Sequence, residues 1–229
     1  MKAALFFFFH CTFFLAACAQ RDTTPVTLVT EHQLAIGETT VTVQETSFAT
    51  PLPFFLVHLH GNEVTAADVA QAVAAKEGIP LLRIVNGAER LLTFRQNNQT
   101  FRFDPNRIFS DSGIQKTLAL YNKASDPAFP TLKAFRDTLL TLIDTSNIVI
   151  ALHNNTNERF SILQYKAANA LVHINAEQDP DDFFLTNDTG IFNRLKEINF
   201  NVVLEDASAV EDDGSLSIYC SRQNIRYVN

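Results

Sequence analysis

Two stretches of this 229-residue chain place possible metal ligands at the end of an apolar run. In the first, residues 54–60 are mostly apolar up to His60, Gly61 and Asn62 provide a turn, and Glu63 stands just before a helical pattern. We expect residues 54–60 to form a buried strand that brings His60 and Glu63 together at its carboxyl end. Sites in open α/β sheets gather there, and histidine with a carboxylate is a common pair of zinc ligands. The His-x-x-Glu spacing alone is weak evidence.

The second stretch, residues 147–153, is another apolar run that ends on a histidine, His153. Two buried strands that each deliver a histidine at the same end are the arrangement that a metal site in an α/β sheet requires. Structural alternatives remain for both stretches. Glu63 could be a favourable charge at the start of a helix, and a lone His153 would more often be a hydrogen-bonded core residue.

The remaining histidines of the mature chain fit structural roles. His58 precedes His60 by two residues, so both side chains point to the same side of the strand, and we interpret His58 as a core residue or a support for a ligand. His32 and His173 have no partners in the pattern.

Strand and helix patterns alternate along the rest of the chain. Residues 65–76 are Ala-rich with one apolar stripe, with Thr65 as the expected N-cap and Gly78 just past the end. Residues 225–229 are expected to form a final strand, which as a terminal edge strand would leave its last backbone groups exposed. The alternation predicts an α/β fold with three layers, α/β/α, a mixed and mostly parallel central sheet, and a small N-terminal β-hairpin. The other expected elements are the hairpin at residues 26–29 and 39–43, strands or extended pieces at 80–86, 91–94, 99–103, 171–175 and 200–204, and helices at 113–123, 131–144, 190–198 and 215–222.

Three short motifs stand in order along the chain: His60-Gly61-Asn62-Glu63, Asp104-Pro105-Asn106-Arg107 and Leu152-His153-Asn154. As a set they resemble the zinc carboxypeptidase superfamily, and most closely its branch of succinylglutamate desuccinylases and aspartoacylases. The resemblance covers roughly residues 58–229. It implies that His60, Glu63 and His153 bind Zn²⁺ and leave a fourth position to water, which is the open geometry of a catalytic site.

The resemblance also implies a substrate-binding pair. Arg107 would hold a substrate carboxylate through its planar guanidinium, and Asn106 beside it would supply hydrogen bonds. The alternative is that Arg107 is a structural partner of Asp104 or Asp111. With the substrate role, the chain is expected to be a zinc-dependent amide or peptide hydrolase, of the carboxypeptidase or N-acyl amino acid deacylase type. Its substrate would be a small acyl amino acid or peptide that bears a free carboxylate.

Two departures from the family pattern matter. Many relatives carry an acid two residues before the second histidine, where this chain has Ala151, so a supporting partner of the site is lost. The general-base glutamate of the superfamily sits on a late strand, and this sequence ends about where it is expected, just past Asn229. We therefore expect either a reading frame truncated at its C-terminus or a protein that binds metal without efficient hydrolysis. Glu205 and Glu211 are the nearest other carboxylates, and neither matches the family position.

The N-terminus has the pattern of an export signal. Lys2 supplies a positive charge, and the apolar residues 3–17 are too few for a membrane-spanning helix. The sequence Leu15-Ala16-Ala17-Cys18 resembles the lipobox of bacterial lipoproteins, in which Cys18 would carry the lipid anchor. The alternative is an ordinary secretory peptide cut near the same small residues. By resemblance, Ala19 after the lipidated cysteine indicates a periplasm-facing lipoprotein of the outer membrane.

These patterns divide the chain into a signal peptide at residues 1–17, a tether at 18–25 and a zinc-hydrolase-like α/β domain at 26–229. A net charge of −7 and a pI of about 5.3 leave no basic stripe for a phosphate backbone, which argues against nucleic acid as a partner. Three function classes remain: a zinc hydrolase, a lipid-anchored binding module that keeps the zinc pocket without turnover, and a structural envelope lipoprotein in which the motifs are chance.

Overall fold

The computed structural model describes residues 27–122, 126–155, 160–206 and 210–229. The expected signal peptide, the tether and Cys18 lie outside the described residues. No helix within the described ranges is long and apolar enough to cross a membrane.

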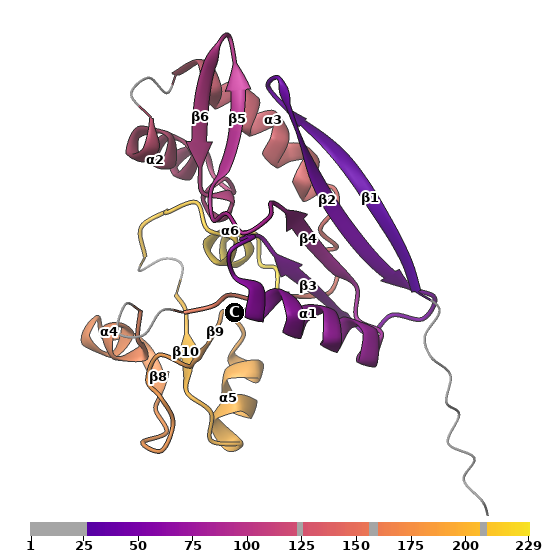
Figure 1. Ribbon diagram of the computed structural model, residues 1–229. Helices are drawn as coiled ribbons and strands as arrows, with labels where there is room; N and C mark the ends of the chain where they lie inside the picture. The colour runs from indigo at the N-terminus through magenta and orange to yellow at the C-terminus, as the bar shows by residue number, and fades with distance from the viewer. Residues whose placement is uncertain (1–26, 123–125, 156–159, 207–209) are drawn as a thin grey trace, which may run out of the picture.

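One large sheet dominates the described part of the chain, with strand order β1-β2-β4-β3-β7-β11-β9-β10-β8, and β5 with β6 forms a separate hairpin (Figure 1). The strands are β1 (Thr27–Ile36), β2 (Thr39–Phe48), β3 (Phe54–His58), β4 (Leu81–Val85), β5 (Leu92–Gln96), β6 (Gln99–Phe103), β7 (Ile148–Ala151), β8 (Leu171–His173), β9 (Phe184–Thr186), β10 (Val202–Leu204) and β11 (Tyr227–Val228). The helices are α1 (Val64–Glu77), η1 (Pro105–Arg107), α2 (Asp111–Tyr121), η2 (Asp126–Ala128), α3 (Phe129–Leu140), α4 (Ile162–Ala167), α5 (Thr189–Glu197) and α6 (Leu216–Arg222).

The centre of the large sheet is parallel and its flanks are mixed. Strands β4, β3, β7 and β11 run parallel to one another. On one side β2 pairs antiparallel with β4 and β1 antiparallel with β2, and on the other side β9 pairs antiparallel with β11. The predicted α/β class, with a mixed sheet and an N-terminal hairpin, is confirmed. Because β3 and β7 are parallel and paired from Phe54↔Ile148 to Val57↔Ala151, the residues that follow them emerge at the same edge.

Strand β3 is buried on both faces, which is why its sequence is a nearly continuous apolar run. Phe55 and Val57 pack into the larger core, which also holds apolar residues of α3 and α6. Leu56 points to the opposite face and packs with Ala70 of α1 in a second, smaller core. The alternation of side chains along the strand thus connects helices on both faces of the sheet.

Helix α1 begins one residue before the predicted N-cap, so the assignment of Thr65 as the cap was wrong. The N-cap residue is Glu63, and its side chain makes no capping hydrogen bond because it is turned toward the two histidines. At the other end, Gly78 has φ 70° and its N–H donates to the carbonyl of Ala74, as the predicted C-cap requires.

The final strand is central, so the expectation of an exposed terminal edge was wrong. Strand β11 lies between β7 and β9, and Tyr227 is 2% exposed. The backbone N–H and carbonyl of Asn229 pair with Leu185 of β9. Strand β9 has only three residues, which is too short for a periodic pattern to reveal it.

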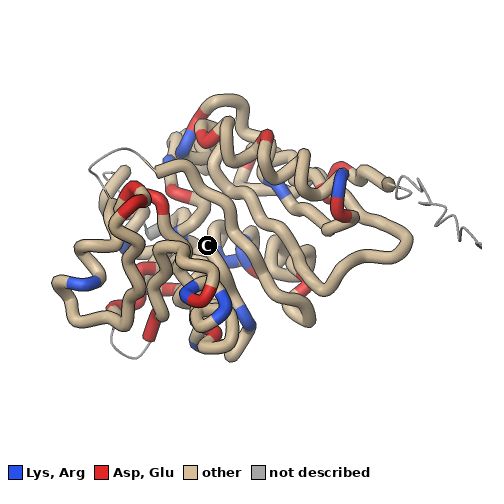
Figure 2. The backbone as a smooth tube through the Cα atoms, turned by 90° about the horizontal axis from the view of Figure 1, so that it is seen from below, with Lys and Arg blue, Asp and Glu red and all other residues tan. Residues whose placement is uncertain are grey.

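Charged residues are interspersed over the described fold. Seen from below, Lys and Arg alternate with Asp and Glu along the backbone and do not gather into one basic stripe in this view (Figure 2). This distribution agrees with the acidic balance of the sequence.

The segment before α6 packs tightly on η1, the short helix that carries Asn106 and Arg107. The N–H of Phe109 donates to the carbonyl of Gly214 at 3.0 Å. A Cβ atom on Gly214 would lie 2.4 Å from the carbonyl oxygen of Arg107, and the φ of Gly214 is +77°. Only glycine therefore fits at this contact.

We expect Gly214→Ala to lower the free energy of unfolding by about 3 kcal/mol, because the substitution meets both a positive φ and a backbone clash. Gly87→Ala is the matched control, since Gly87 has φ +55° but no atom within 4 Å of the added Cβ. We expect it to lose only about 1 kcal/mol. Urea unfolding of both variants measures the difference, and equal losses would show that the Gly214 contact is not tightly packed.

Candidate metal centre

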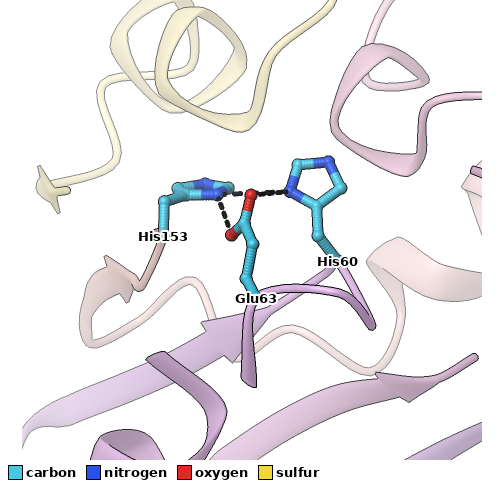
Figure 3. Close-up of side chains that lie close together, drawn as sticks. All are labelled: His60, Glu63 and His153. Carbon is cyan, nitrogen blue, oxygen red and sulfur yellow. Dashed lines mark hydrogen bonds and ion pairs between the residues drawn. The ribbon is translucent and has the colours of Figure 1, made fainter. Parts of the chain in front are cut away.

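Three side chains from two strand ends converge on one point. His60 and Glu63 come from the loop after β3, and His153 follows β7 (Figure 3). His60 Nδ1 lies 3.0 Å from Glu63 Oε1, and His153 Nδ1 lies 2.9 Å from Glu63 Oε2. The two Nδ1 atoms are 3.3 Å apart. Within the described residues, these three form a group that could hold a metal ion.

The spacing of these atoms is near that of a coordination polyhedron. Two ligand atoms that each lie about 2.0–2.2 Å from zinc, at the tetrahedral angle, are about 3.3–3.6 Å apart. The two Nδ1 atoms, 3.3 Å apart, reach this range, whereas their contacts with the two oxygens of Glu63, at 3.0 and 2.9 Å, are shorter and would lengthen around an ion. The side chain of His60 is fully buried and that of Glu63 is 4% exposed, whereas that of His153 is 19% exposed, so the site opens on the His153 side.

Asp104 determines which nitrogen of His60 is available. Its Oδ1 lies 2.7 Å from His60 Nε2 and also accepts the N–H of Asn106 at 2.9 Å. An ionised carboxylate only accepts hydrogen bonds, so His60 carries a proton on Nε2 and, when neutral, presents a lone pair at Nδ1. This carboxylate–histidine contact is the support that metal-binding histidines commonly have. The sequence motif marked Asp104 but did not reveal this role.

Arg90 bridges the two buried carboxylates of the site. Its guanidinium donates to Glu63 Oε1 at 2.9 Å and to Asp104 Oδ2 at 3.2 Å. The loop that carries Arg90 approaches closely because of Gly61, where a Cβ would lie 2.6 Å from the carbonyl oxygen of Gly87. Arg90 stands outside the three motifs, and sequence reasoning missed it.

The charges of the site shift the pKa values of its members. Burial alone would raise the pKa of Glu63, but hydrogen bonds with His153 and His60 lower it well below its usual range. Burial likewise opposes the ionisation of Asp104, yet His60 and Arg90 lower the pKa of Asp104 to about 2. For His60, burial lowers the pKa, whereas Asp104 and Glu63 raise it by more, so its net pKa is raised. The site therefore combines two ionised carboxylates with imidazole nitrogens that attract a positive charge.

Two further residues hold the Glu63 turn in place. His58 Nε2 donates to the backbone carbonyl of Glu63 at 3.1 Å, and burial lowers the pKa of His58. His58 is thus a support and not a ligand, as predicted. Asn154 accepts the N–H of Ala66 with its Oδ1 at 2.8 Å and donates its own N–H to Glu63 Oε2 at 3.3 Å. Asn154 therefore caps α1 from the other strand end, a role the motif did not show.

The predicted substrate-binding residues lie on η1, directly after Asp104. Arg107 forms an ion pair with Asp213, and not with Asp104 or Asp111 as the structural alternative suggested. Asn106 accepts the N–H of Leu216, the first residue of α6, with its Oδ1 at 3.1 Å. Both residues thus contact the segment before α6. The side chain of Arg107 remains 37% exposed, so part of its guanidinium can reach a ligand.

The two alternative carboxylates are separate from the cluster. Glu205 accepts a hydrogen bond from Ser221 Oγ at 3.4 Å, and Glu211 pairs with the exposed Lys116. Glu205 lines a cleft of about 1110 Å³ near α4 and α6, and the cleft is not lined by His60, Glu63 or His153. The ligand chemistry and this cleft are therefore in different places. Burial, followed by the charge of Asp213, raises the pKa of Glu205 to about 7.

Comparisons with known proteins gave no match, whether with protein-family models, with curated proteins or with solved structures. The resemblance to the zinc carboxypeptidase superfamily thus stays a prediction that rests on the three motifs.

The raised pKa of Glu205 predicts a stability that falls as pH rises. In the folded protein this carboxyl ionises near pH 7, against about 4.3 in an unfolded chain, so the folded state binds the proton more tightly. The contribution of Glu205 to the free energy of unfolding is fully present below about pH 4 and is lost as pH rises through 7. We expect Glu205→Gln to be more stable than the wild type at pH 8, by up to about 3 kcal/mol, and nearly equal at pH 4.5.

Urea unfolding across this pH range measures the effect. Glu197→Gln is the control, because it removes an exposed carboxylate instead of a buried one. A Glu205→Gln variant that follows the wild-type pH dependence would contradict the assignment of this slope to Glu205.

Proposed function

We propose that the protein is a zinc-dependent amide or peptide hydrolase of the carboxypeptidase or N-acyl amino acid deacylase type. The observation that carries the proposal is the convergence of His60 Nδ1, His153 Nδ1 and the carboxylate of Glu63 within 3.3 Å of one another, with the His60 tautomer fixed by Asp104. Two imidazoles and one carboxylate are a common ligand set of catalytic zinc, which leaves a position open. A zinc ion held there would polarise a carbonyl and lower the pKa of water.

The proposed substrate carries a free carboxylate near the scissile amide. Arg107 follows Asp104 by three residues, and Asp104 contacts His60, so one short segment of the chain carries both the proposed carboxylate-binding group and the partner of a candidate ligand. The ion pair with Asp213 engages one part of a guanidinium that has five N–H donors, so donors remain for a substrate. Asp213 also accepts the N–H of Ser215, which fixes its carboxylate beside Arg107.

The second candidate function is a lipid-anchored binding module of the cell envelope that holds zinc or a ligand without efficient turnover. It is favoured by the engagement of both carboxylates at the cluster: Glu63 lies between the histidines, and Asp104 holds His60 and Arg90. Among the described residues we assign no general base. Export and lipid attachment at Cys18 belong to both proposals.

We expect the mature protein to retain about one equivalent of zinc after dialysis, because three ligands are already in place. His153→Ala should weaken zinc binding by more than about 100-fold, since it removes a ligand. Asp104→Asn should weaken it by about 10- to 100-fold, as the loss of a supporting residue does. Elemental analysis and competition with a chromogenic chelator measure both effects.

His173→Ala is the control for this series, because His173 is a half-buried residue of β8 whose side chain hydrogen-bonds to Asn199 at 3.0 Å and takes no part in the cluster. It should bind zinc like the wild type. Less than stoichiometric zinc in the wild type would count against both proposed functions.

We expect the zinc-loaded protein to hydrolyse acyl amino acids in preference to analogues with an amidated carboxyl group. Arg107→Gln should remove this preference by raising KM about tenfold or more for the carboxylate substrates, as expected for the loss of a charge-assisted contact. Asp213→Asn breaks the same ion pair but keeps Arg107, and it should retain the preference. Steady-state kinetics on both substrate classes measure the effect.

Hydrolysis by the wild type that is lost in His153→Ala identifies an enzyme. Stoichiometric zinc with no turnover of either substrate class would instead favour the binding module.

A further inference from the structure

The position of Arg90 places a positive charge next to the atoms that would hold a metal ion. Glu63 Oε1 is shared between Arg90 and His60, at 2.9 Å and 3.0 Å. An ion bound by His60 Nδ1 and Glu63 would thus share the Glu63 carboxylate with the guanidinium of Arg90 and lie close to it. Because burial of Glu63 and Asp104 limits screening by water, the two positive charges repel one another more than at an open surface.

The charge balance of the site depends on this residue. Glu63 and Asp104 each contact the guanidinium of Arg90, and as carboxylates the two together would balance a divalent ion. With Arg90 included, the same set carries one positive charge in excess. The side chain of Arg90 is 44% exposed, so solvent weakens the repulsion without removing it.

The backbone holds Arg90 in this position. Asn86 Nδ2 donates to the carbonyls of Glu89 and Leu91, which flank Arg90 on both sides. The same loop packs on Gly61. The backbone on both sides of Arg90 is therefore fixed, which keeps the base of its side chain beside the site.

We propose that Arg90 limits the affinity of the site for divalent ions by opposing the ion with its own charge. The proposal rests on the metal site of the proposed function and assigns to Arg90 the control of how tightly the ion is held. Because Arg90 is partly exposed, solvent screens its charge, and we expect the repulsion to weaken zinc binding by about tenfold.

Zinc titrations of the metal-free full-length mature protein against a chromogenic chelator test this. Arg90→Gln should bind Zn²⁺ about tenfold more tightly than the wild type. Arg90→Lys keeps the charge and should stay within about threefold of the wild type. Arg102→Gln is the matched control, because Arg102 is exposed on β6 and only its backbone groups make hydrogen bonds to other described residues, so the same charge is removed at a distance.

The dependence of zinc affinity on ionic strength gives a second measurement, which does not require the variants to be equally stable. The difference between the wild type and Arg90→Gln should narrow from low salt to about 0.5 M salt, where exposed charges are screened. Weaker zinc binding by Arg90→Gln would overturn the proposal and show that Arg90 acts by holding the carboxylates. Equal binding in both proteins would overturn the inference alone, whereas an absence of zinc binding in both would overturn the proposed function together with this inference.

Discussion

The site depends on one constraint: a carboxylate and two imidazoles, which all attract positive charge, are held close together and largely out of water. The carboxylate of Glu63 lies between two imidazoles, and the His60 nitrogen that faces it carries a lone pair when the ring is neutral. Such groups can stay together only if a proton, a guanidinium or a metal ion lies among them. The raised pKa of His60 favours a proton on its ring, and Arg90 supplies a guanidinium, so both features meet this requirement.

The sheet imposes this convergence. Strands β3 and β7 are paired in parallel with Val57 opposite Ala151, so His60 and His153 leave the sheet at the same edge. Asn154 then bonds to the first turn of α1, which fixes the second loop against the first. A shift of the register by one residue would turn the strand residues to the opposite face and separate the ligands. The apolar contacts on both faces of β3 oppose such a shift.

The cluster of His60, Glu63 and His153 could be predicted from the sequence because each histidine ends an apolar run, and such runs mark the ends of buried strands. The residues around the cluster could not be found in this way. Arg90 stands in a loop pattern, 27 positions from Glu63, and nothing in its neighbours shows that Gly61 lets the loop approach. The strand β9 was likewise missed because three residues carry no period, and its absence from the prediction made β11 look like an edge.

The three side chains of the cluster are held unequally. His60 is held by Asp104, and Glu63 is held by Asn154 and by the contact of His58 with its backbone. His153 contacts Glu63 and His60, and Nε2 of His153 has no hydrogen-bond partner within the described part of the chain. The orientation of the His153 ring therefore depends on its two contacts at Nδ1.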